Sequence, residues 1–318
     1  MRCNLILLAV FASLRWVADA QFEKRFICQT PNICGYNRLR GGDGHQLQER
    51  YLYTLRSSLT GILLATDQYV VANGFNATVR QMGLDWPLYG QTMAGLMRTE
   101  MLHELLHRAY LEQHLMGDFL EAGVWRGGSC IYAKGFMDAY SIKRQVFVAD
   151  SFAGLPPSEH LFEIGDWNKA SFLSVSEAEV RDNFQRYQLL DDSVVFVTGF
   201  FDKTLPKLRD DWRNNGHSLA LLRMDSDMYK GSLEILCNLY EFLEVGGYYI
   251  EDDYYDDMAV RQASLDFRHA HNITDSPVPV GDGVGVWFQK RQNVSIDERW
   301  CLKQMGKRPK RYHHYRLK

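Results

Sequence analysis

Apolar residues recur at helical spacing in the first part of the chain. Two stretches, residues 49–66 and 92–114, place leucine, isoleucine and methionine three or four positions apart, as on one face of an amphipathic helix. Such faces are usually buried against a core. We therefore predict two or three helices ahead of residue 117, packed against the part of the chain that follows.

Beyond residue 117 the pattern changes to short apolar runs separated by helical patterns. The runs that indicate buried strands are one ending at Glu121 and residues 145–150, 193–201, 219–225, 246–253 and 283–290. The helical patterns lie at residues 129 onward, 176–187, 231–243 and 258–270. Strands that alternate with helices predict an α/β fold, with a mostly parallel sheet covered by helices on both faces.

The chain of 318 residues, 46% hydrophobic and 13% aromatic, is long enough to bury a full core. Polar, glycine-rich sequence before residue 48 and basic residues at the end indicate extensions around one large domain. The predicted segments are a signal peptide (1–20), a cysteine-containing extension (21–48), a helical lid (49–116), a core (117–292) and a basic C-terminal tail (293–318).

The first 20 residues have the pattern of a secretory signal peptide. Arg2 precedes an apolar run from Leu5 to Leu14, and residues 18–20 (ADA) form a small-x-small cleavage site. The run is short for a bilayer span, so we favour cleavage over a signal anchor, and no later segment is apolar enough to cross a membrane. The prediction is a protein of the secretory pathway, in the Golgi lumen or secreted. Asn-x-Ser/Thr sites compatible with this route lie at Asn76, Asn272 and Asn293.

Charge is distributed unevenly along the chain. The formal net charge is −3, yet residues 301–318 hold seven Lys or Arg and no acid, so the body of the chain is acidic. An acidic body argues against a nucleic-acid-binding core. The basic tail is compatible with recruitment of a polyanion and also with a solvated, disordered tail. The sequence leaves the formation of a homo-oligomer open.

The chain has six cysteines, and loss of the first with the signal peptide leaves an odd number. We predict buried free thiols for Cys130 and Cys237. A disulfide among Cys28, Cys34 and Cys301 is compatible with an oxidising compartment, although the sequence leaves the pair open. No spacing of these cysteines resembles a zinc site.

The stretch GDFLEAGVWRGGSCIYAKGF, residues 117–136, indicates a strand, a glycine-rich loop and a helix. Glycines permit tight turns, and they also let the backbone approach a bound group while the helix N-terminus offers free N–H donors. From this stretch alone, a purely structural loop and a cradle for a nucleotide-like cofactor are equally supported.

Ligands of parallel sheets bind beyond the carboxyl ends of the strands, so the last residue of each strand is informative. Asp150 follows the second strand, where an acid can accept hydrogen bonds from both hydroxyls of a ribose; a solvated aspartate is the alternative. The loop GVWRGG lacks the G-x-G-x-x-G spacing of dinucleotide sites. This difference favours S-adenosylmethionine over a nicotinamide cofactor.

The segments MDSDMY (224–229) and EDDYYDD (251–257) hold the densest group of acids. If their strands are neighbours, Asp225 or Asp227 meets Asp252 and Asp253, and three uncompensated carboxylates raise one another's pKa. A divalent cation resolves this repulsion. Oxygen ligands without His or Cys favour Mg²⁺, with Ca²⁺ and Mn²⁺ as alternatives, over zinc. The competing interpretation is that the acids cap helices or face solvent.

Several segments occur in a characteristic order: ERYLYTLRSSLTG, WPLYGQTMAGLMR, FLEAGVWRGGS, VFVADSFAGLP, DNFQRYQLLDDSVVFVTGFFDKTLP, LALLRMDSDMYKGSLEIL, GGYYIEDDY and DGVGVWFQK. Together they resemble the macrocin O-methyltransferase (TylF-type) family, whose members are metal-dependent S-adenosylmethionine O-methyltransferases of sugar hydroxyls in macrolide antibiotics. The signal peptide, the cysteine-bearing extension and the basic tail lie outside the likeness.

The resemblance implies a Rossmann-like class I methyltransferase fold, with a seven-stranded, mostly parallel sheet and an N-terminal helical lid. It also implies S-adenosylmethionine and Mg²⁺ as cofactors, and it places Met93 near the acceptor. The cofactor-binding residues that it implies are Glu121, Gly123, Gly128, Ser129, Asp150, Ser151 and Phe200. The implied metal ligands are Asp225, Asp227, Asp252 and Asp253, with Asp227 and Asp252 also as catalytic residues.

One departure from the family concerns Ser226. Family members tend to have Asp-Gly-Asp-Leu-Tyr where this chain has Asp-Ser-Asp-Met-Tyr at residues 225–229. Because both acids are kept, we expect the metal site to survive.

The predicted function is an S-adenosylmethionine- and Mg²⁺-dependent O-methyltransferase acting on a hydroxyl of a small-molecule or glycan acceptor in the secretory pathway. The alternative is a secreted binding protein that keeps a degenerate methyltransferase fold without turnover. The general base stays open among His217, His269, His271, an aspartate and water.

Overall fold

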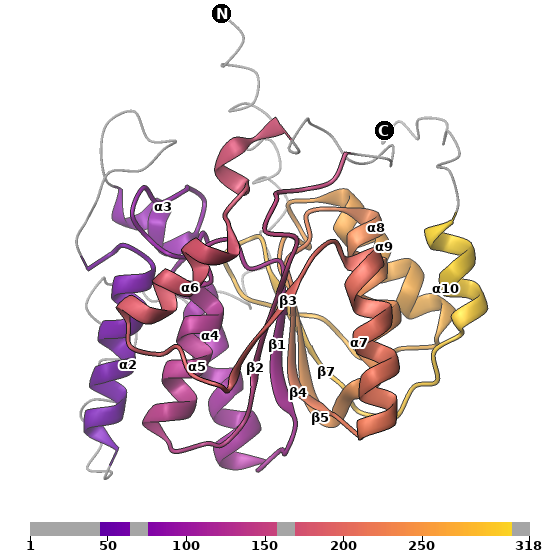
Figure 1. Ribbon diagram of the computed structural model, residues 1–318, viewed down its shortest axis with the longest axis horizontal. Helices are drawn as coiled ribbons and strands as arrows, with labels where there is room; N and C mark the ends of the chain where they lie inside the picture. The colour runs from indigo at the N-terminus through magenta and orange to yellow at the C-terminus, as the bar shows by residue number, and fades with distance from the viewer. Residues whose placement is uncertain (1–44, 64–75, 158–168, 307–318) are drawn as a thin grey trace, which may run out of the picture.

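The computed structural model describes residues 45–63, 76–157 and 169–306 (Figure 1). The predicted signal peptide, Cys28 and Cys34 in the extension, and residues 307–318 of the tail lie outside the described residues. Within the described ranges, no helix has the length and apolar character that a membrane span requires.

A seven-stranded sheet forms the centre of the molecule, in the order β3-β2-β1-β4-β5-β7-β6. β1 to β5 run parallel, β7 is antiparallel to β5, and β6 is antiparallel to β7. The predicted mostly parallel, seven-stranded sheet is confirmed. The strands are β1 (Asp118–Ala122), β2 (Val146–Asp150), β3 (Val194–Thr198), β4 (Leu219–Met224), β5 (Leu243–Glu251), β6 (Val278–Pro279) and β7 (Val286–Gln289).

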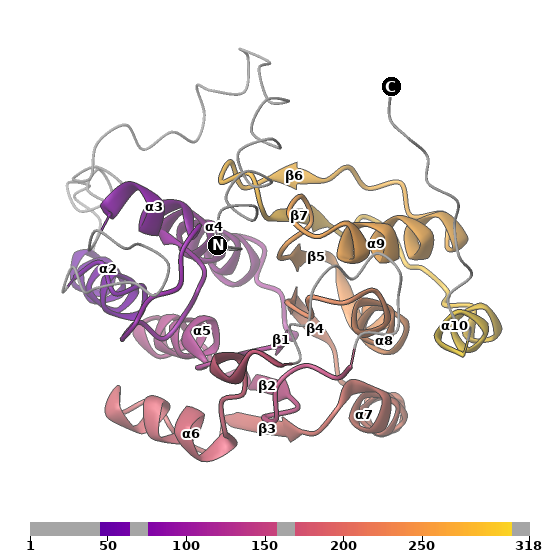
Figure 2. The same cartoon turned by 90° about the horizontal axis from the view of Figure 1, so that it is seen from above.

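Helices cover both faces of the sheet, as predicted (Figure 2). One layer holds α2 (Gln46–Leu59), α3 (Ala77–Met82), α4 (Leu96–His107), α5 (Gly128–Ala139) and α6 (Glu177–Arg186). The other holds α7 (Phe201–Asn215), α8 (Tyr229–Leu239), α9 (Met258–Ala270) and α10 (Glu298–Met305). Side chains alternate along each strand, so neighbours such as Phe119 and Leu120 are buried in different layers.

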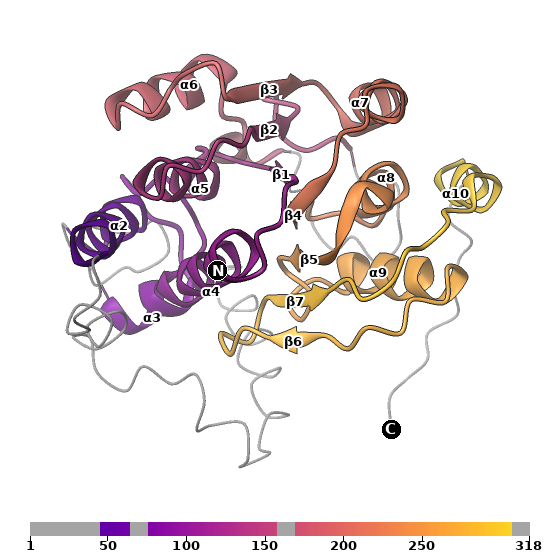
Figure 3. The same ribbon diagram turned by 90° about the horizontal axis from the view of Figure 1, so that it is seen from below.

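Most of the predicted helical lid belongs to the core. Leu52 and Leu55 of α2 and Leu105 of α4 are buried in the same cluster as the apolar face of α5. α4 continues into a π-helical turn, Arg108–Glu112. Figure 3 shows α3 beside α4, and the loop that joins them is the part of the predicted lid that approaches the glycine loop. We call this segment, residues 83–95, the lid loop.

The C-terminal part of the described chain differs from the sequence prediction. Residues 298–305, expected within a basic tail, form α10, and Cys301 on this helix is disulfide-bonded to Cys237 of α8. The prediction of a free thiol at Cys237 is therefore wrong, whereas Cys130 is free and buried as predicted. The cause is tertiary: a helix beyond the last strand brings Cys301 onto α8.

Two strands, β3 and β6, also differ from the sequence prediction. β3 ends at Thr198 and α7 begins at Phe201, so the apolar pair 200–201 starts a helix and does not extend the strand. Gly199, with φ of 132°, makes the turn between them. β6 was not predicted, because two residues carry no periodic signal.

Candidate functional site

The turns after β4 and β5 bring the predicted acidic segments together. The two strands are neighbours and pair Met224 with Glu251 at their carboxyl ends. This pairing confirms the condition on which the predicted acidic cluster depended. The acids of residues 225–227 and 252–253 consequently share one edge of the sheet with Asp150, which ends β2 beyond β1.

Asp225, Asp227 and Asp253 form a compact group of carboxylates, here called the acidic cluster. One oxygen from each lies within 4.8 Å of the others, close enough for a single divalent cation to bind all three. Asp227 and Asp253 have left-handed backbones, with φ of 53° and 56°. Aspartate is one of the few non-glycine residues that tolerate this conformation, which is otherwise uncommon.

The pKa shifts of the three carboxyls in the acidic cluster indicate mutual repulsion that a bound cation would relieve. Burial raises the pKa of all three carboxyls above the ordinary aspartate value, and repulsion among the neighbouring acids raises it further. Asp227 and Asp253 also hydrogen-bond each other. Two carboxyl groups can do this when one of them keeps its proton. The donor set, oxygen only and rich in charge, fits Mg²⁺, whose binding would release these protons.

Arg223, the last residue but one of buried β4, is the cation around which the acids are arranged. Its guanidinium pairs with Glu121, its register neighbour on β1, and lies 2.8 Å from Asp225 and 3.1 Å from Asp252. Burial alone would lower the pKa of Arg223, but the three carboxylates outweigh burial and raise it well above its ordinary value. The expectation of uncompensated carboxylates is therefore wrong for Asp225 and Asp252.

Asp252 lies beside the acidic cluster and is held by two arginines. Its Oδ2 is 2.5 Å from Nη1 of Arg98, in the first turn of α4, and 3.1 Å from Nη2 of Arg223. Burial raises the pKa of Asp252, but the two guanidiniums outweigh burial and lower it below its ordinary value. Asp252 is thus a fixed anion, whereas the other three acids are poised to hold protons or a cation.

Ser226, the departure from the family pattern, fits the turn between the acids. Its hydroxyl is 2.8 Å from that of Ser232 on α8 and donates to the carbonyl oxygen of Met228. The side chain is buried. The turn therefore accommodates a serine at position 226 between Asp225 and Asp227.

Contacts or backbone geometry within the protein explain why each of these positions in the loop after β1 is a glycine. A Cβ on Gly123, where φ is 89°, would collide with the carbonyl oxygen of Asp225. A Cβ on Gly128 would lie 2.5 Å from the carbonyl oxygen of Gln91, and Gly127 has φ of 83°. The glycines are thus required by close packing against the metal-site turn and the lid loop. The case for a cofactor therefore depends on the residues around them.

Asp150 is fixed by the backbone of the same loop. Its carboxylate accepts hydrogen bonds from the N–H groups of Val124 and Phe152, both at 2.8 Å. Ser151 turns its hydroxyl to the carbonyl oxygen of Gly154, at 2.7 Å. The backbone N–H of Trp125 and, at 3.4 Å, the hydroxyl of Ser151 also bond this carboxylate, so the protein itself supplies four donors to it. Asp150 lies at the carboxyl end of β2, and its contact with a ribose stays a prediction.

Glu121 is fully buried next to the start of α5. Its Oε2 accepts a hydrogen bond from Sγ of Cys130 at 2.8 Å, and the hydroxyl of Ser129 bonds the same carboxylate. Burial raises the pKa of Glu121, and Arg223 opposes this rise. The structure therefore groups Glu121 and Ser129, both predicted for the cofactor, in one hydrogen-bonded set.

The remaining candidates divide between the two edges of the sheet. Phe200, 42% exposed, follows β3 at the edge of the acids, and Met93 lies in the lid loop. His217 precedes β4, and His269 and His271 end α9, which runs from the acidic edge to the opposite one. The structure therefore separates all three histidines from the acids, and none of them is placed to act as general base.

Arg126 attaches the lid loop to the glycine loop. Its Nη1 donates to the carbonyl oxygens of Pro87, Leu88 and Gly90, at 3.3, 3.0 and 2.9 Å. The N–H of Gly128 donates to the lid loop as well. The lid loop is thereby held against the cofactor side of the site.

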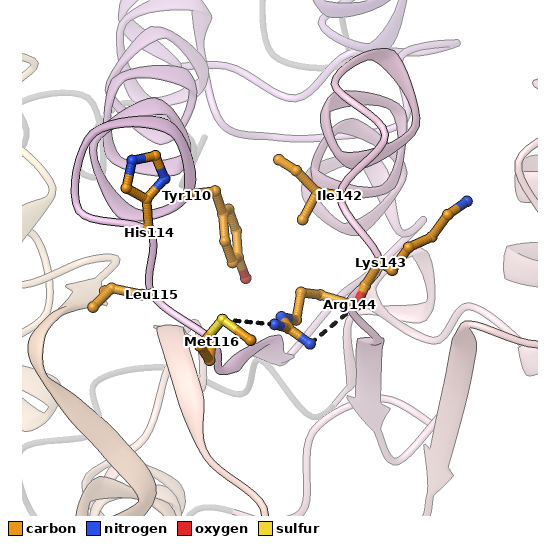
Figure 4. A pocket seen from close by; sticks show the side chains of 7 residues that line it. All are labelled: Tyr110, His114, Leu115, Met116, Ile142, Lys143 and Arg144. Atoms are coloured by element: carbon orange, nitrogen blue, oxygen red, sulfur yellow. Dashed lines mark hydrogen bonds between the residues drawn. The ribbon is translucent and has the colours of Figure 1, made fainter.

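Two shallow clefts, of about 270 and 180 Å³, lie away from this site. Figure 4 shows the first, lined by residues such as Tyr110, His114 and Arg144. Residues of both clefts directly precede β1, β2 and β4, so the clefts lie at the amino edge of the sheet. They take no part in the acidic site.

Sequence reasoning missed the arginines of this site. Arg223 carried a signal: it interrupts the apolar run LALLRM, and a buried cation must be paired with an anion. Arg98 and Arg126 carried none, because arginine is ordinary in a helix turn or a loop.

Comparisons with known proteins agree with this geometry. The profile of the family described as macrocin-O-methyltransferase (TylF) matches residues 42–290. Demethyldecarbamoylnovobiocin O-methyltransferase of Streptomyces niveus is 39% identical over 222 residues, which cover 68% of this chain and 82% of that protein. The 8-demethyl-8-(2,3-dimethoxy-alpha-L-rhamnosyl)-tetracenomycin-C 4'-O-methyltransferase of Streptomyces olivaceus is 36% identical over 257 residues, 76% of this chain and 93% of that protein.

Among solved structures, the O-methyltransferase NovP superposes with a TM-score of 0.71 and 34% sequence identity, over 77% of this chain and 100% of that chain. The match to the family ends at residue 290, so α10 and Cys301 of the disulfide lie outside it, whereas Cys237 lies inside. The sheet, the acidic cluster and the glycine loop all lie inside it. The chain therefore belongs to the macrocin O-methyltransferase family and is an S-adenosylmethionine-dependent O-methyltransferase.

Proposed function

We propose that this enzyme transfers the methyl group of S-adenosylmethionine to a hydroxyl of a sugar or glycan, with Mg²⁺ at the acidic cluster, in the secretory pathway. The observation that carries the proposal is the adjacency of two groups at one sheet edge. Asp150 ends β2 and Glu121 lies next to the end of β1, whereas the acidic cluster follows the neighbouring β4 and β5. Donor and acceptor sites would thus lie side by side.

On the donor side, the carboxylate of Asp150 would accept the ribose hydroxyls, one of them in place of the long bond from Ser151. Glu121 and Ser129, in their shared hydrogen-bonded set, would line the methionine end. Methyl transfer from a sulfonium is an in-line displacement, so the oxygen, the methyl carbon and the sulfur must be aligned at short range. The packing of the lid loop on the glycine loop restricts how the donor can lie.

On the acceptor side, Asp225, Asp227 and Asp253 would hold the cation. Bound Mg²⁺ supplies Lewis-acid stabilisation of a hydroxyl that is losing its proton. Asp227, whose own proton the cation would displace, would then offer a carboxylate beside that hydroxyl to take its proton. Asp252 is not suited to this role, because two guanidiniums lower its pKa and occupy Oδ2.

The sugar acceptor is supported by a relative. The enzyme of Streptomyces olivaceus is named for methylation of a rhamnosyl-bearing compound at a 4'-oxygen. The acidic cluster of this chain could orient two neighbouring hydroxyls, a feature common in sugars.

Three features support the secretory location. Residues 1–20 have the signal pattern, and the Cys237–Cys301 disulfide is typical of oxidising compartments. Asn272 and Asn293 are exposed, and they follow α9 and β7 at the sheet edge opposite the acids. N-glycans at these two sites would leave the active site open.

The proposal is tested by incubating the purified, secreted protein with labelled S-adenosylmethionine and a panel of glycans. The expected result is label on a sugar hydroxyl of one acceptor class. Calorimetry with S-adenosylhomocysteine accompanies the assay. Binding without transfer to any glycan would reject the acceptor, and the absence of binding would favour the degenerate, non-catalytic alternative.

A further inference from the structure

Arg98 joins four parts of the molecule at one buried guanidinium. It lies in the first turn of α4. Its Nη1 is 2.5 Å from Oδ2 of Asp252, its Nε is 2.9 Å from Oδ2 of Asp282, and its Nη2 donates to the carbonyl oxygen of Gly83 at 2.8 Å. One side chain thus links the start of the lid loop, α4, the turn after β5 and the turn before β7.

The surroundings of Arg98 leave room for this geometry. A Cβ on Gly83 would collide with Nη2, and one on Gly285 would lie 3.4 Å from Cδ. Gly83, with φ of 69°, also closes α3 in the left-handed conformation that glycine adopts without strain. Gly83 therefore leaves room for the guanidinium, which hydrogen-bonds Asp252 and the carbonyl oxygen of Gly83 and forms an ion pair with Asp282.

Asp282 anchors the far side of the guanidinium. Its Oδ1 accepts hydrogen bonds from the N–H groups of Val284 and Gly285, at 2.9 and 3.1 Å. Both Asp282 and Asp252 are buried, so each needs a cationic partner. Asp252 keeps Arg223 if Arg98 is lost, but Asp282 has no second arginine among its described ion pairs.

We infer that Arg98 is a positioning residue that sets the geometry of the metal site through Asp252 and couples it to the lid loop. The inference rests on the proposed function, because it concerns the site proposed for Mg²⁺. Arg98 touches none of the three acids of the acidic cluster by a described ion pair; it fixes Asp252, the chain neighbour of Asp253. Residues that orient metal ligands in this indirect way change metal affinity by about 10- to 100-fold when mutated.

Positioning and simple charge compensation predict opposite results. If Arg98 only lowered the negative charge near the acids, its removal would strengthen the attraction of Mg²⁺ to the site. If it positions Asp252, removal weakens binding although the site becomes more negative. Arg98→Lys distinguishes the two explanations further, because its ammonium keeps the positive charge. A single ammonium cannot contact Asp252, Asp282 and the carbonyl oxygen of Gly83 together, as the guanidinium does.

The experiment compares Arg98→Met and Arg98→Lys with Arg56→Met. Arg56 is a matched control, a buried arginine of α2 paired with Glu100 at 2.5 Å. The Mg²⁺ Kd is measured by calorimetry with S-adenosylhomocysteine present, together with kcat and the KM for S-adenosylmethionine. Both Arg98 variants should raise the Mg²⁺ Kd by about 10- to 100-fold and lower kcat, with the cofactor KM unchanged. Arg56→Met should lower Tm and leave the Mg²⁺ Kd as in the wild type.

A metal-free readout accompanies these titrations. The amide hydrogens of Val284 and Gly285 should exchange faster in both Arg98 variants, since Asp282 loses its anchor. A Mg²⁺ Kd that is unchanged or lower in Arg98→Met, or restored by Arg98→Lys, would overturn the inference. If Arg98→Met does not fold, Asp282→Asn tests the ion pair between Arg98 and Asp282. A raised Mg²⁺ Kd supports the inference, and an unchanged Kd rejects it. Wild-type protein that binds no Mg²⁺ would instead reject the proposed function.

Discussion

Nη2 of Arg223 lies 3.1 Å from Oδ2 of Asp252, across the boundary between β4 and the turn after β5. The same guanidinium pairs with Glu121 on the cofactor side and with Asp225 on the metal side. One buried cation thus balances the charge of both halves of the site. The predictions below test this arrangement and the elements that support it.

Arg223→Met should lower the free energy of unfolding more than the substitution of an exposed arginine does. It leaves Glu121, Asp225 and Asp252 without their shared cation. Breaking a buried ion pair by removing one partner costs about 3–5 kcal/mol. Arg186→Met, which removes an exposed pair with Asp182, is the control and should cost about 0–1 kcal/mol. Urea unfolding measures both; equal losses of unfolding free energy would contradict the account.

The metal-free enzyme should lose stability as pH rises through the acidic range. The pKa of Asp253 is raised in the folded protein, so between the ordinary aspartate pKa and the raised value the folded state binds more protons than the unfolded state. Stability from this group is then lost as pH increases, by at most about 1.4 kcal/mol per pH unit.

Asp253→Asn isolates this effect, because asparagine also tolerates the left-handed backbone at φ 56°. Without metal, the variant should exceed the wild type in Tm at neutral pH and match it near pH 4. Saturating Mg²⁺ should stabilise only the wild type. A variant that is less stable than the wild type in EDTA at neutral pH would show that the acids do not repel one another.

Gly123→Ala should disturb the metal site from the cofactor loop. The added Cβ meets the carbonyl oxygen of Asp225, and the shift that follows costs about 1–3 kcal/mol as overpacking. Gly216→Ala is the matched control: it has a similar positive φ, 72°, but nothing within 4 Å of the new atom. The control should lose only about 1–2 kcal/mol of unfolding free energy through backbone strain and keep its Mg²⁺ affinity. Unaltered Mg²⁺ affinity in Gly123→Ala would refute the coupling.

Removal of the Cys237–Cys301 disulfide should reduce stability without abolishing catalysis. The bond closes a loop with a sequence separation of 64, for which the chain-entropy estimate is about 4 kcal/mol. α10 lies at the outer side of the α7–α9 layer (Figure 2), away from the acids. Cys301→Ala and reduction of the wild type should lower Tm by similar amounts and leave kcat unchanged. A loss of turnover at temperatures where the variant is folded would contradict this assignment.

Much of the fold could be predicted because the strands are apolar and their order alternates with helices. Residues 258–270 were predicted as a helix, and α9 has the same bounds. The leucines of α2 and α4 gave helical periodicity but could not show whether they covered a ligand or the core, since both surfaces are apolar. The pairing of Cys301 with Cys237 depends on where α10 docks, which no local pattern encodes.

The acids of the site were predictable because parallel strands place their carboxyl ends at one edge. Their ion pairs were not. Arg98 and Asp252 are separated by 154 positions, and only the packing of α4 against the sheet brings them together. The glycines were predicted to serve a cofactor, yet the structure gives each a steric reason in neighbouring backbone. Their conformation depends on the turns that carry Asp225 and Gln91, which are distant in sequence.

The central claim is that Asp225, Asp227 and Asp253 hold a Mg²⁺ ion that is required for methyl transfer to a hydroxyl. The most direct measurement is transfer of labelled methyl groups by the wild type and by Asp253→Asn, in EDTA and after Mg²⁺ is restored. The account predicts that EDTA abolishes transfer by the wild type, that Mg²⁺ restores it, and that Asp253→Asn stays inactive in both conditions while still binding S-adenosylhomocysteine. Undiminished transfer by the wild type in EDTA, or wild-type turnover by Asp253→Asn with Mg²⁺, would contradict it.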